Sequence, residues 1–201
     1  MLKAIVFVLC LLPTAWLSWR YQHHQLGFNP LETVARYTGD WTLRFLIATL
    51  LITPLRRIPG WNGLIKLRRM LGLFAFFYAC QHFLHYLAVD KIWDWPEIYS
   101  DFTLRRFYIF GLIGWLSMLP LALTSFNAAI RWMGGKRWQM LHRLVYMAGL
   151  SGVIHYLMQG KAANLEPLLY CAVMVVLLLY RVVWWANKAR VRRQEAVARS
   201  T

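Results

Sequence analysis

Residues 70–89 read MLGLFAFFYACQHFLHYLAV, and this stretch decides the fold. It contains no Asp, Glu, Lys or Arg, and it is as long as the helix of about 20 residues that crosses a hydrocarbon core. A backbone in lipid must satisfy its own polar groups, and the alternating pattern of a membrane β-strand is missing. The stretch is therefore predicted to be a transmembrane helix, and it carries His82 and His85.

Further apolar runs lie on both sides of this helix and are predicted to be helices as well. The composition agrees, because 59% of the chain is hydrophobic and only 15% is charged, which is too little polar surface for a soluble domain. The prediction is one all-α integral membrane domain over residues 1–201, a bundle of six transmembrane helices. The expected spans are 4–19, 41–55, 70–89, 107–125, 138–158 and 167–185.

Basic and balanced loops alternate along the chain. Residues 56–69 and 126–143 hold five and four Lys or Arg and no acid, and the tail from Arg181 holds six against Glu195. The loops between them carry similar numbers of acids and bases. By the positive-inside rule, both termini and the two basic loops are predicted to be cytoplasmic, with the chain in a bacterial inner membrane. The basic tail also allows contact with anionic membrane lipid.

The sequence excludes nucleic-acid binding and covalent attachment of a haem. The net charge of +15 does not indicate nucleic-acid binding, because the basic residues cluster between apolar runs and no binding motif accompanies them. Cys10, Cys80 and Cys171 all lie inside apolar runs and are interpreted as core thiols. No Cys-x-x-Cys-His motif is present, so covalent attachment of a c-type haem is excluded.

Three histidines inside the apolar runs, His82, His142 and His155, are the candidate cofactor ligands. Ligating side chains inside a membrane are costly and mark functional sites. The third and fifth predicted helices run in the same direction, and His82 lies 13 residues after Arg69, as His155 does after His142. At about 1.5 Å per residue, His82 and His155 share one depth on the periplasmic side. They are predicted to be the axial pair of a b-type haem, and His142 is predicted to hold a second haem or one end of it.

Helix geometry alone does not place His142 and His155 on one face. Thirteen residues turn a side chain by roughly 220°, so a kink or π-bulge around residues 149–152 would be needed to correct the facing. Glycines 72, 111 and 114 would allow a macrocycle to approach closely or would simply pack helices. Other candidates for the site are His85 as a less favoured ligand, and Arg68 and Arg44 as partners of haem propionates.

Four segments carry a resemblance to a known family: FLIATLLITPLRR, RRMLGLFAFFYACQHFLHY, LALTS and GKRWQMLHRLVYMAGLSGVIHYL. They resemble MsrQ, the haem-binding membrane subunits of bacterial protein-methionine-sulfoxide reductase systems, in the wider ferric reductase-like transmembrane group. The resemblance covers nearly the whole chain. It implies a b-type haem held by His82, His142 and His155. It also shows Arg68 where oxidase relatives carry a fourth histidine, which leaves the second ligand of a cytoplasmic haem open.

The resemblance also implies a task and partners. Members of the family deliver electrons to MsrP, a periplasmic molybdopterin enzyme that reduces methionine sulfoxide in oxidised proteins. Their electrons are linked to the quinone pool or to a cytoplasmic flavin reductase. The family is linked to FMN as well, and this chain has no flavin motif, so FMN rests on the resemblance alone.

Two other functions compete with a non-catalytic electron-transfer subunit. A self-contained transmembrane ferric or oxygen reductase would need flavin and nicotinamide domains, which the short loops of this chain leave no room for. A transporter could use the intramembrane histidines as a proton relay. A haem absorption spectrum separates the two haem-based functions from the transporter.

Overall fold

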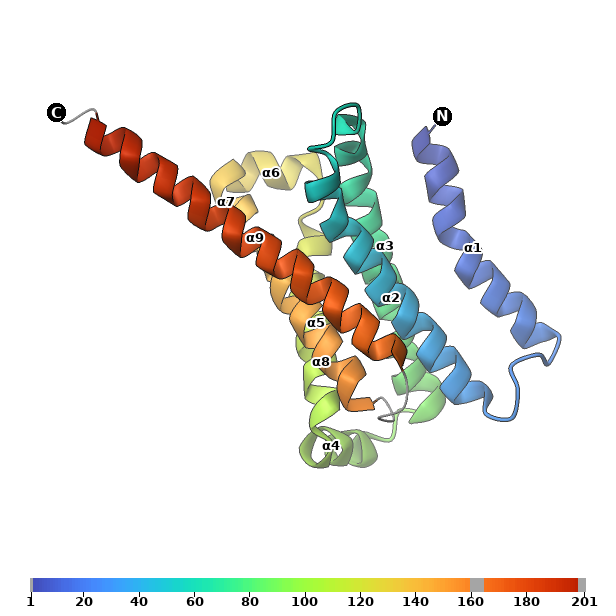
Figure 1. The fold of residues 1–201 in the computed structure, drawn as a ribbon. Coiled ribbons are helices and arrows are strands. Elements are labelled where there is room, and N and C mark those ends of the chain that lie inside the picture. The colour runs from blue at the N-terminus through green and yellow to red at the C-terminus, as the bar shows by residue number, and fades with distance from the viewer. Residues whose placement is uncertain (1, 160–164, 199–201) are drawn as a thin grey trace.

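The structure is a computed structural model that describes residues 2–159 and 165–198, and all of its regular elements there are helices. Six long helices run in turn from one end of the molecule to the other, and both chain ends point toward the same end (Figure 1). The long helices are α1 (Leu2–Gln22), α2 (Pro30–Leu55), α3 (Ile65–His85), α5 (Arg106–Leu123), α8 (Leu144–Gln159) and α9 (Leu165–Ala198).

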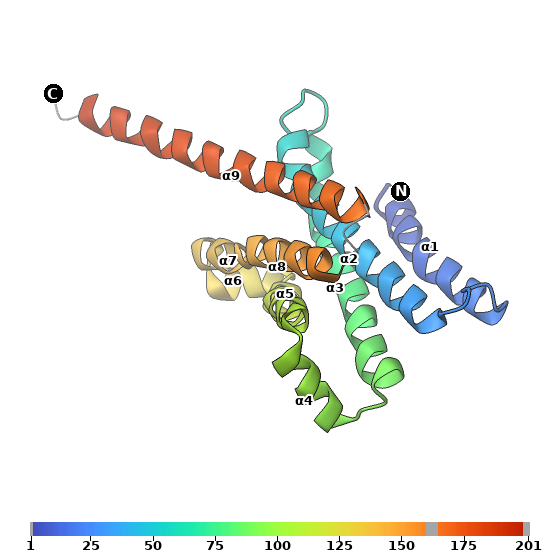
Figure 2. The ribbon, with the colours of Figure 1, turned by 60° about the horizontal axis from the view of Figure 1, so that its bottom comes forward.

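Short elements close the two ends of the bundle. Near the chain termini lie the 3-10 turn η1 (Asn62–Leu64), α6 (Asn127–Met133) and α7 (Gly135–Leu141). At the opposite end α3 continues into a π-helical turn, η2 (Tyr86–Asp90), and α4 (Trp95–Leu104) follows there (Figures 1 and 2). The closest helix pairs are α2 with α3 and α5 with α8, so the bundle centre lies between these two pairs.

Four segments within the described residues are long and apolar enough to cross a membrane. They are Leu2–Gln22, Asn62–Asp90, Arg106–Leu123 and Leu165–Glu195. The expected spans over 41–55 and 138–158 fall on α2 and α8, which are not among these four. The structure is thus that of a helical, multi-pass membrane protein.

Helix α2 begins well before residue 41. The side chain of Asn29 accepts a hydrogen bond from the backbone N–H of Glu32 at 3.2 Å, and Pro30 occupies the first helical turn. Both features are favoured at helix N-termini, since the first backbone N–H groups have no partner inside the helix. At the other end of the chain, α9 continues past residue 185 to Ala198, and its last part extends away from the other helices (Figure 2).

The prediction of one helix over residues 138–158 is wrong. α7 ends at Leu141 and α8 begins at Leu144, and His142 and Arg143 form the turn between them. The helical angle between His142 and His155 therefore has no meaning, and α8 runs without a break through residues 149–152. Gly149 instead allows close packing, because a Cβ there would lie 2.9 Å from the Met174 sulfur.

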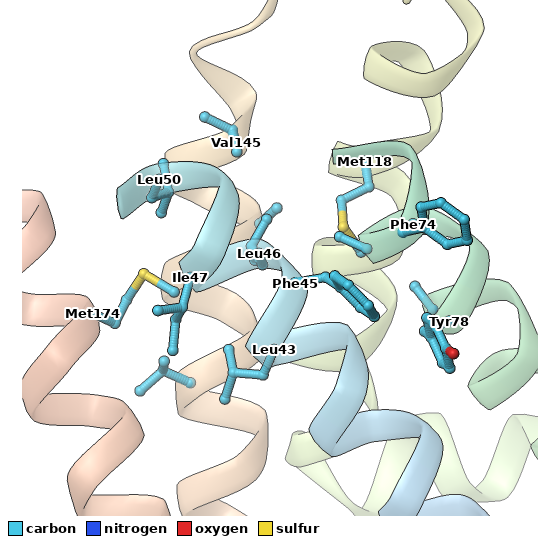
Figure 3. Close-up of a cluster of buried hydrophobic side chains, with 14 of the residues drawn as sticks. Leu43, Phe45, Leu46, Ile47, Leu50, Phe74, Tyr78, Met118, Val145 and Met174 are labelled. Atoms are coloured by element: carbon cyan, nitrogen blue, oxygen red, sulfur yellow. The ribbon is translucent and has the colours of Figure 1, made fainter. Parts of the chain in front are cut away.

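Aromatic and aliphatic side chains fill the core between the long helices (Figure 3). The Phe45 ring stacks on Tyr78 with centroids 5.2 Å apart and lies 5.8 Å from Phe74. Tyr78 is completely buried, and its hydroxyl donates to the Cys10 carbonyl at 2.8 Å while accepting from the Thr14 N–H at 3.2 Å. A regular helix pairs those two backbone groups directly. The tyrosine hydroxyl thus bridges them and fastens α1 to α3.

Candidate functional site

His82 on α3 and His155 on α8 come together in the bundle centre. Their ring centroids are 6.0 Å apart, with ring planes at 84°. The Nδ1 atom of His82 lies 2.8 Å from the carbonyl oxygen of Ala35, and that of His155 lies 2.7 Å from the carbonyl oxygen of Phe107. A carbonyl oxygen can only accept, so each Nδ1 carries the proton and donates it. Each Nε2 atom is then left with a free lone pair.

This hydrogen-bonding pattern is the one that metal-binding histidines use. A ligating imidazole usually donates its other N–H to a carbonyl or carboxylate, which fixes the tautomer and the ring orientation. Two metal–nitrogen bonds of about 2 Å each, plus the path from each nitrogen to its ring centre, add up to roughly 6 Å. The observed 6.0 Å between centroids therefore fits one metal ion shared by His82 and His155.

A cavity of about 770 Å³ adjoins the two imidazoles. Its volume lies in the range of about 300–1,000 Å³ that is typical of small-molecule and cofactor sites. Helices α2, α3, α5 and α8 supply most of its wall, which is largely apolar in the interior and polar toward the end where α4 lies. Leu43, Leu46, Phe83, Trp115 and Met118 form part of the apolar wall.

Glycines keep the space around both rings open. A Cβ at Gly111 on α5 would lie 2.9 Å from two atoms of the His155 ring, which is closer than real Cβ contacts come. A Cβ at Gly39 on α2 would lie 3.3 Å from the His82 ring. Gly114, by contrast, faces the backbone of α8 and packs helices, and Gly72 faces Thr49. Gly39 was not among the predicted residues, since its contact with His82 comes from tertiary packing.

The donor set fits a haem and does not fit a bare metal ion. Within residues 2–159 and 165–198, no group of three or more His, Cys, Asp or Glu is placed to hold a metal. Two imidazoles alone leave most of a coordination shell unfilled. A planar tetrapyrrole supplies the remaining four nitrogens, and a flat apolar cavity between two axial imidazoles is its usual environment.

The comparisons with known proteins point to one family. A family model described as "Ferric reductase like transmembrane component" matches residues 38–153. A protein-methionine-sulfoxide reductase heme-binding subunit MsrQ from Herminiimonas arsenicoxydans is 46% identical over 94% of this chain and 88% of its own length. The MsrQ subunit from Azospira oryzae is 49% identical over 90% of this chain and 78% of its own.

The chain belongs to the MsrQ family of ferric reductase-like transmembrane proteins. A longer relative exists as well: magnetosome protein MamZ from Magnetospirillum gryphiswaldense is 40% identical over 91% of this chain and only 29% of its own length. The matched segment is thus also used as one part of a larger protein.

In this MsrQ-family chain His142 lies apart from the cavity. It follows α7 directly, stacks on Trp138 with ring centroids 3.7 Å apart, and has Nδ1 3.0 Å from the Trp138 carbonyl oxygen. Its Nε2 atom is buried and makes no hydrogen bond to any part of the chain that the structure describes. Arg68 and Arg69 lie close enough to this imidazole for their positive charges to influence it. His142 thus keeps one free nitrogen, and it does not line the cavity of His82 and His155.

The other predicted residues of this MsrQ-family member lie around the site in different ways. His85 lines the outer part of the cavity, with Nε2 2.9 Å from the Leu31 carbonyl oxygen, so that nitrogen is already engaged. Arg44 does not line the cavity; its Nε donates to the Tyr170 hydroxyl at 2.7 Å and its guanidinium lies over Trp41. Arg68 lies at the other end of the bundle, close to His142.

An ionic cluster that the sequence did not reveal adjoins the polar end of the cavity, because its partners Tyr86 and Arg105 line the wall there. Lys91 is buried and contacts Glu97 at 2.5 Å and Asp101 at 2.8 Å, and Asp101 also accepts from the Tyr86 hydroxyl at 3.2 Å. Burial raises the pKa of Asp101, but its bonds to Lys91 and Tyr86 outweigh burial and lower that pKa overall. The cluster joins η2 to α4.

The turn that this cluster supports is strained. Ile92 and Trp93 adopt φ of 49° and 59°, a region that side-chain-bearing residues, and β-branched ones above all, rarely enter. Such a conformation persists only when several interactions with the surrounding structure hold it in place. The ion pairs of Lys91, together with the hydrogen bond from the Trp93 N–H to the Leu87 carbonyl at 2.9 Å, provide that support.

Proposed function

We propose that this chain is a b-type haem electron-transfer subunit, with the haem held between His82 and His155. The observation that carries the proposal is the pair of facing imidazoles, each tied through Nδ1 to a backbone carbonyl, beside a cavity of about 770 Å³. The names of its MsrQ relatives, which are haem-binding subunits, support it. A bound haem would supply reversible one-electron chemistry at its iron.

The protein contributes binding, orientation and exclusion of water. The Ala35 and Phe107 carbonyls fix the two imidazole tautomers, and the glycines at 39 and 111 leave room for the rings. The wall includes two arginines at its polar end, Arg36 and Arg105, and we propose these, in place of Arg44 and Arg68, as partners of haem propionates. The interior part of the wall is largely apolar and would limit the access of water to the metal position.

We propose a periplasmic MsrP-like molybdoenzyme as the electron acceptor, so that the chain serves the repair of methionine sulfoxide in oxidised proteins. The names of the MsrQ relatives, which are subunits of protein-methionine-sulfoxide reductase, support this assignment. The electron donor is proposed to be the quinone pool or a cytoplasmic flavin reductase. Its electrons would enter at the end of the bundle where His142 lies, and His142 is proposed to hold a second haem or one end of it. FMN has no support in the names of the relatives or in the cavity and is not part of the proposal.

The proposed topology has six spans, both termini in the cytoplasm, and the chain in the bacterial inner membrane. The alternating direction of the six long helices and the shared position of both chain ends support it (Figure 1). With this orientation the His82–His155 cavity opens toward the periplasm, where the acceptor is. A C-terminal alkaline phosphatase fusion should be inactive, and an active one would reverse the orientation.

The first test is the reduced-minus-oxidised spectrum of the purified chain. The proposal requires b-type haem bands, and a proton-coupled transporter would show none. The second test mixes the reduced protein with a purified MsrP-like enzyme and a methionine sulfoxide substrate in the absence of oxygen. Reoxidation that depends on both additions supports an electron-transfer subunit. Equal reoxidation by ferric citrate or oxygen alone would favour the self-contained reductase.

A further inference from the structure

A buried arginine without an acidic partner lies far from the haem-binding cavity. Arg181 on α9 is only 7% exposed. One of its terminal nitrogens donates to the Tyr146 hydroxyl at 3.2 Å and the other to the Leu50 carbonyl at 3.3 Å. Both acceptors are uncharged. No ion pair to Arg181 occurs in the described ranges, 2–159 and 165–198.

More arginines gather around Arg181. Arg57, just past the end of α2, has its guanidinium 5.5 Å from the ring centre of Tyr180, the residue before Arg181. Arg56 precedes it in the chain, and Arg56 and Arg68 on α3 add positive charge near Arg181. The guanidinium of Arg57 also lies over the Trp184 ring on α9, 5.1 Å from the ring centre. We call these four residues the arginine cluster. It joins α2, α3 and α9 at the end of the bundle where the chain termini point (Figure 1).

The chain cannot neutralise this cluster itself. Of the eight acidic residues in the sequence, Glu195 is the only one that follows Glu166, and it lies 14 residues beyond Arg181 on the same helix, or about 21 Å along its axis. None lies between Asp40 and Asp90, or between Asp101 and Glu166. The other seven lie in the first half of α2, at the end of η2, in or just before α4, and at the start of α9; they are Glu32, Asp40, Asp90, Asp94, Glu97, Asp101 and Glu166.

Such an arrangement calls for an anion from outside the chain. A buried charge without a counter-ion costs several kcal/mol, and neighbouring like charges add to that cost. Guanidinium groups match the oxygen atoms of phosphate in pairs of parallel hydrogen bonds, and a phosphate has enough oxygens for several arginines. Trp184 and Trp185, beside the cluster, belong to the residue type enriched at the membrane interface, where phospholipid phosphates lie.

We propose that the arginine cluster is a phosphate-binding site, in which Arg181 supplies the buried contact and Arg56, Arg57 and Arg68 complete the charge. The bound phosphate belongs either to an anionic phospholipid of the adjoining leaflet or to a soluble phosphate compound. By neutralising charges on three helices at once, it fastens α9 to α2 and α3. The site does not depend on the proposed haem function, because no member of the cluster lines the cavity.

The test measures thermal unfolding of the purified full-length chain through its tryptophan fluorescence. The protein is held in neutral detergent at constant ionic strength and receives phosphatidylglycerol, phosphatidylcholine, inorganic phosphate or chloride. We expect the Tm of the unchanged protein to rise by about 5 °C with the phosphate source that binds. A rise with phosphatidylglycerol alone assigns the site to lipid, and a rise with inorganic phosphate assigns it to a soluble compound.

Three variants make the test specific. Arg181→Met should lose the rise in Tm, while its Tm without anion should stay equal or increase, because a buried charge is removed. Arg190→Gln removes one exposed charge from the same helix and should keep the full rise. The exposed pair Arg56→Gln/Arg57→Gln should fold normally and lose part of it, which covers the case in which Arg181→Met does not fold. An equal rise in all three variants, or no rise in the unchanged protein, would overturn the proposal.

Discussion

Two regions of the bundle contain histidines whose Nε2 is free among the described residues, and they differ in their surroundings: the centre holds His82 and His155, and one end holds His142. Around His82 and His155, glycines and a largely apolar wall leave a cavity of about 770 Å³, and Glu32 in the wall pairs with Arg36. Around His142, a stacked tryptophan covers the ring and the nearby charges are all arginines. The comparison shows that the neighbours of a buried histidine, and not the histidine itself, set the shape and charge of the space that a cofactor would meet.

The largest expected effect is at the imidazole pair. His82→Ala or His155→Ala removes one of the two proposed axial ligands, so each should weaken haem binding at least about 100-fold and abolish the low-spin spectrum of this site. Haem content per protein after purification measures it. His23→Ala, which changes an exposed histidine outside the cavity, is the matched control. A full haem spectrum in both cavity variants would show that His82 and His155 are not the ligands, and the two histidine regions would then not differ in haem binding.

A methyl group at Gly111 should have the next largest effect. Gly111→Ala places a Cβ 2.9 Å from the His155 ring, and the ring must move, which should weaken haem binding about tenfold. Gly39→Ala, with a contact of 3.3 Å, should have a smaller effect of the same kind. Gly63→Ala has open space around it and serves as the control. Equal haem affinity in the three variants would show that ring position does not limit binding.

The ionic cluster at the cavity mouth should affect stability more than haem affinity. Asp101→Asn leaves Lys91 with one carboxylate and should cost about 3 kcal/mol of unfolding free energy. Because the folded pKa of Asp101 lies below its ordinary value, its contribution is complete above that ordinary value and disappears as the pH falls through the folded pKa. Denaturant unfolding at several pH values measures both. The acid-induced loss should be smaller in Asp101→Asn, and identical pH curves would contradict the assignment.

The smallest effect on the cavity haem is expected at His142. His142→Ala should leave the spectrum of the His82–His155 site intact, since the ring does not line that cavity. Reduction of this haem by the physiological donor in membranes should slow, whereas a small artificial reductant should still reduce it. Normal donor-driven reduction with unchanged haem content would remove His142 from the electron path.

The helical membrane fold could be predicted because a backbone in lipid can satisfy its polar groups in very few ways. Residues 70–89, twenty largely apolar residues without a charged Asp, Glu, Lys or Arg, allow hardly anything except a helix, and the resulting segment from η1 to η2 covers that range. The pairing of His82 with His155 could be anticipated from matched depth along parallel helices. The pairing survives the break at His142 and Arg143, because α8 still brings His155 to the level of His82.

Other features depend on contacts that no local pattern reveals. The break at His142 and Arg143 lies in an apolar run without proline, so the sequence gives no sign of it. Gly39 owes its role to a ring on another helix, and the buried Lys91 to carboxylates on α4. Arg44 was expected near propionates because of its charge, and Tyr170, far along the chain, holds it elsewhere.

The bridge made by Tyr78 sets an order of assembly. Its hydroxyl occupies the gap between the Cys10 carbonyl and the Thr14 N–H, directly beside Pro13 in α1. Until α3 has entered the membrane, these two backbone groups must find their partners within α1. Docking of the first helix synthesised therefore waits for the third. Tyr78→Phe should leave a bundle of the later helices intact while α1 remains loosely attached and open to protease at its ends.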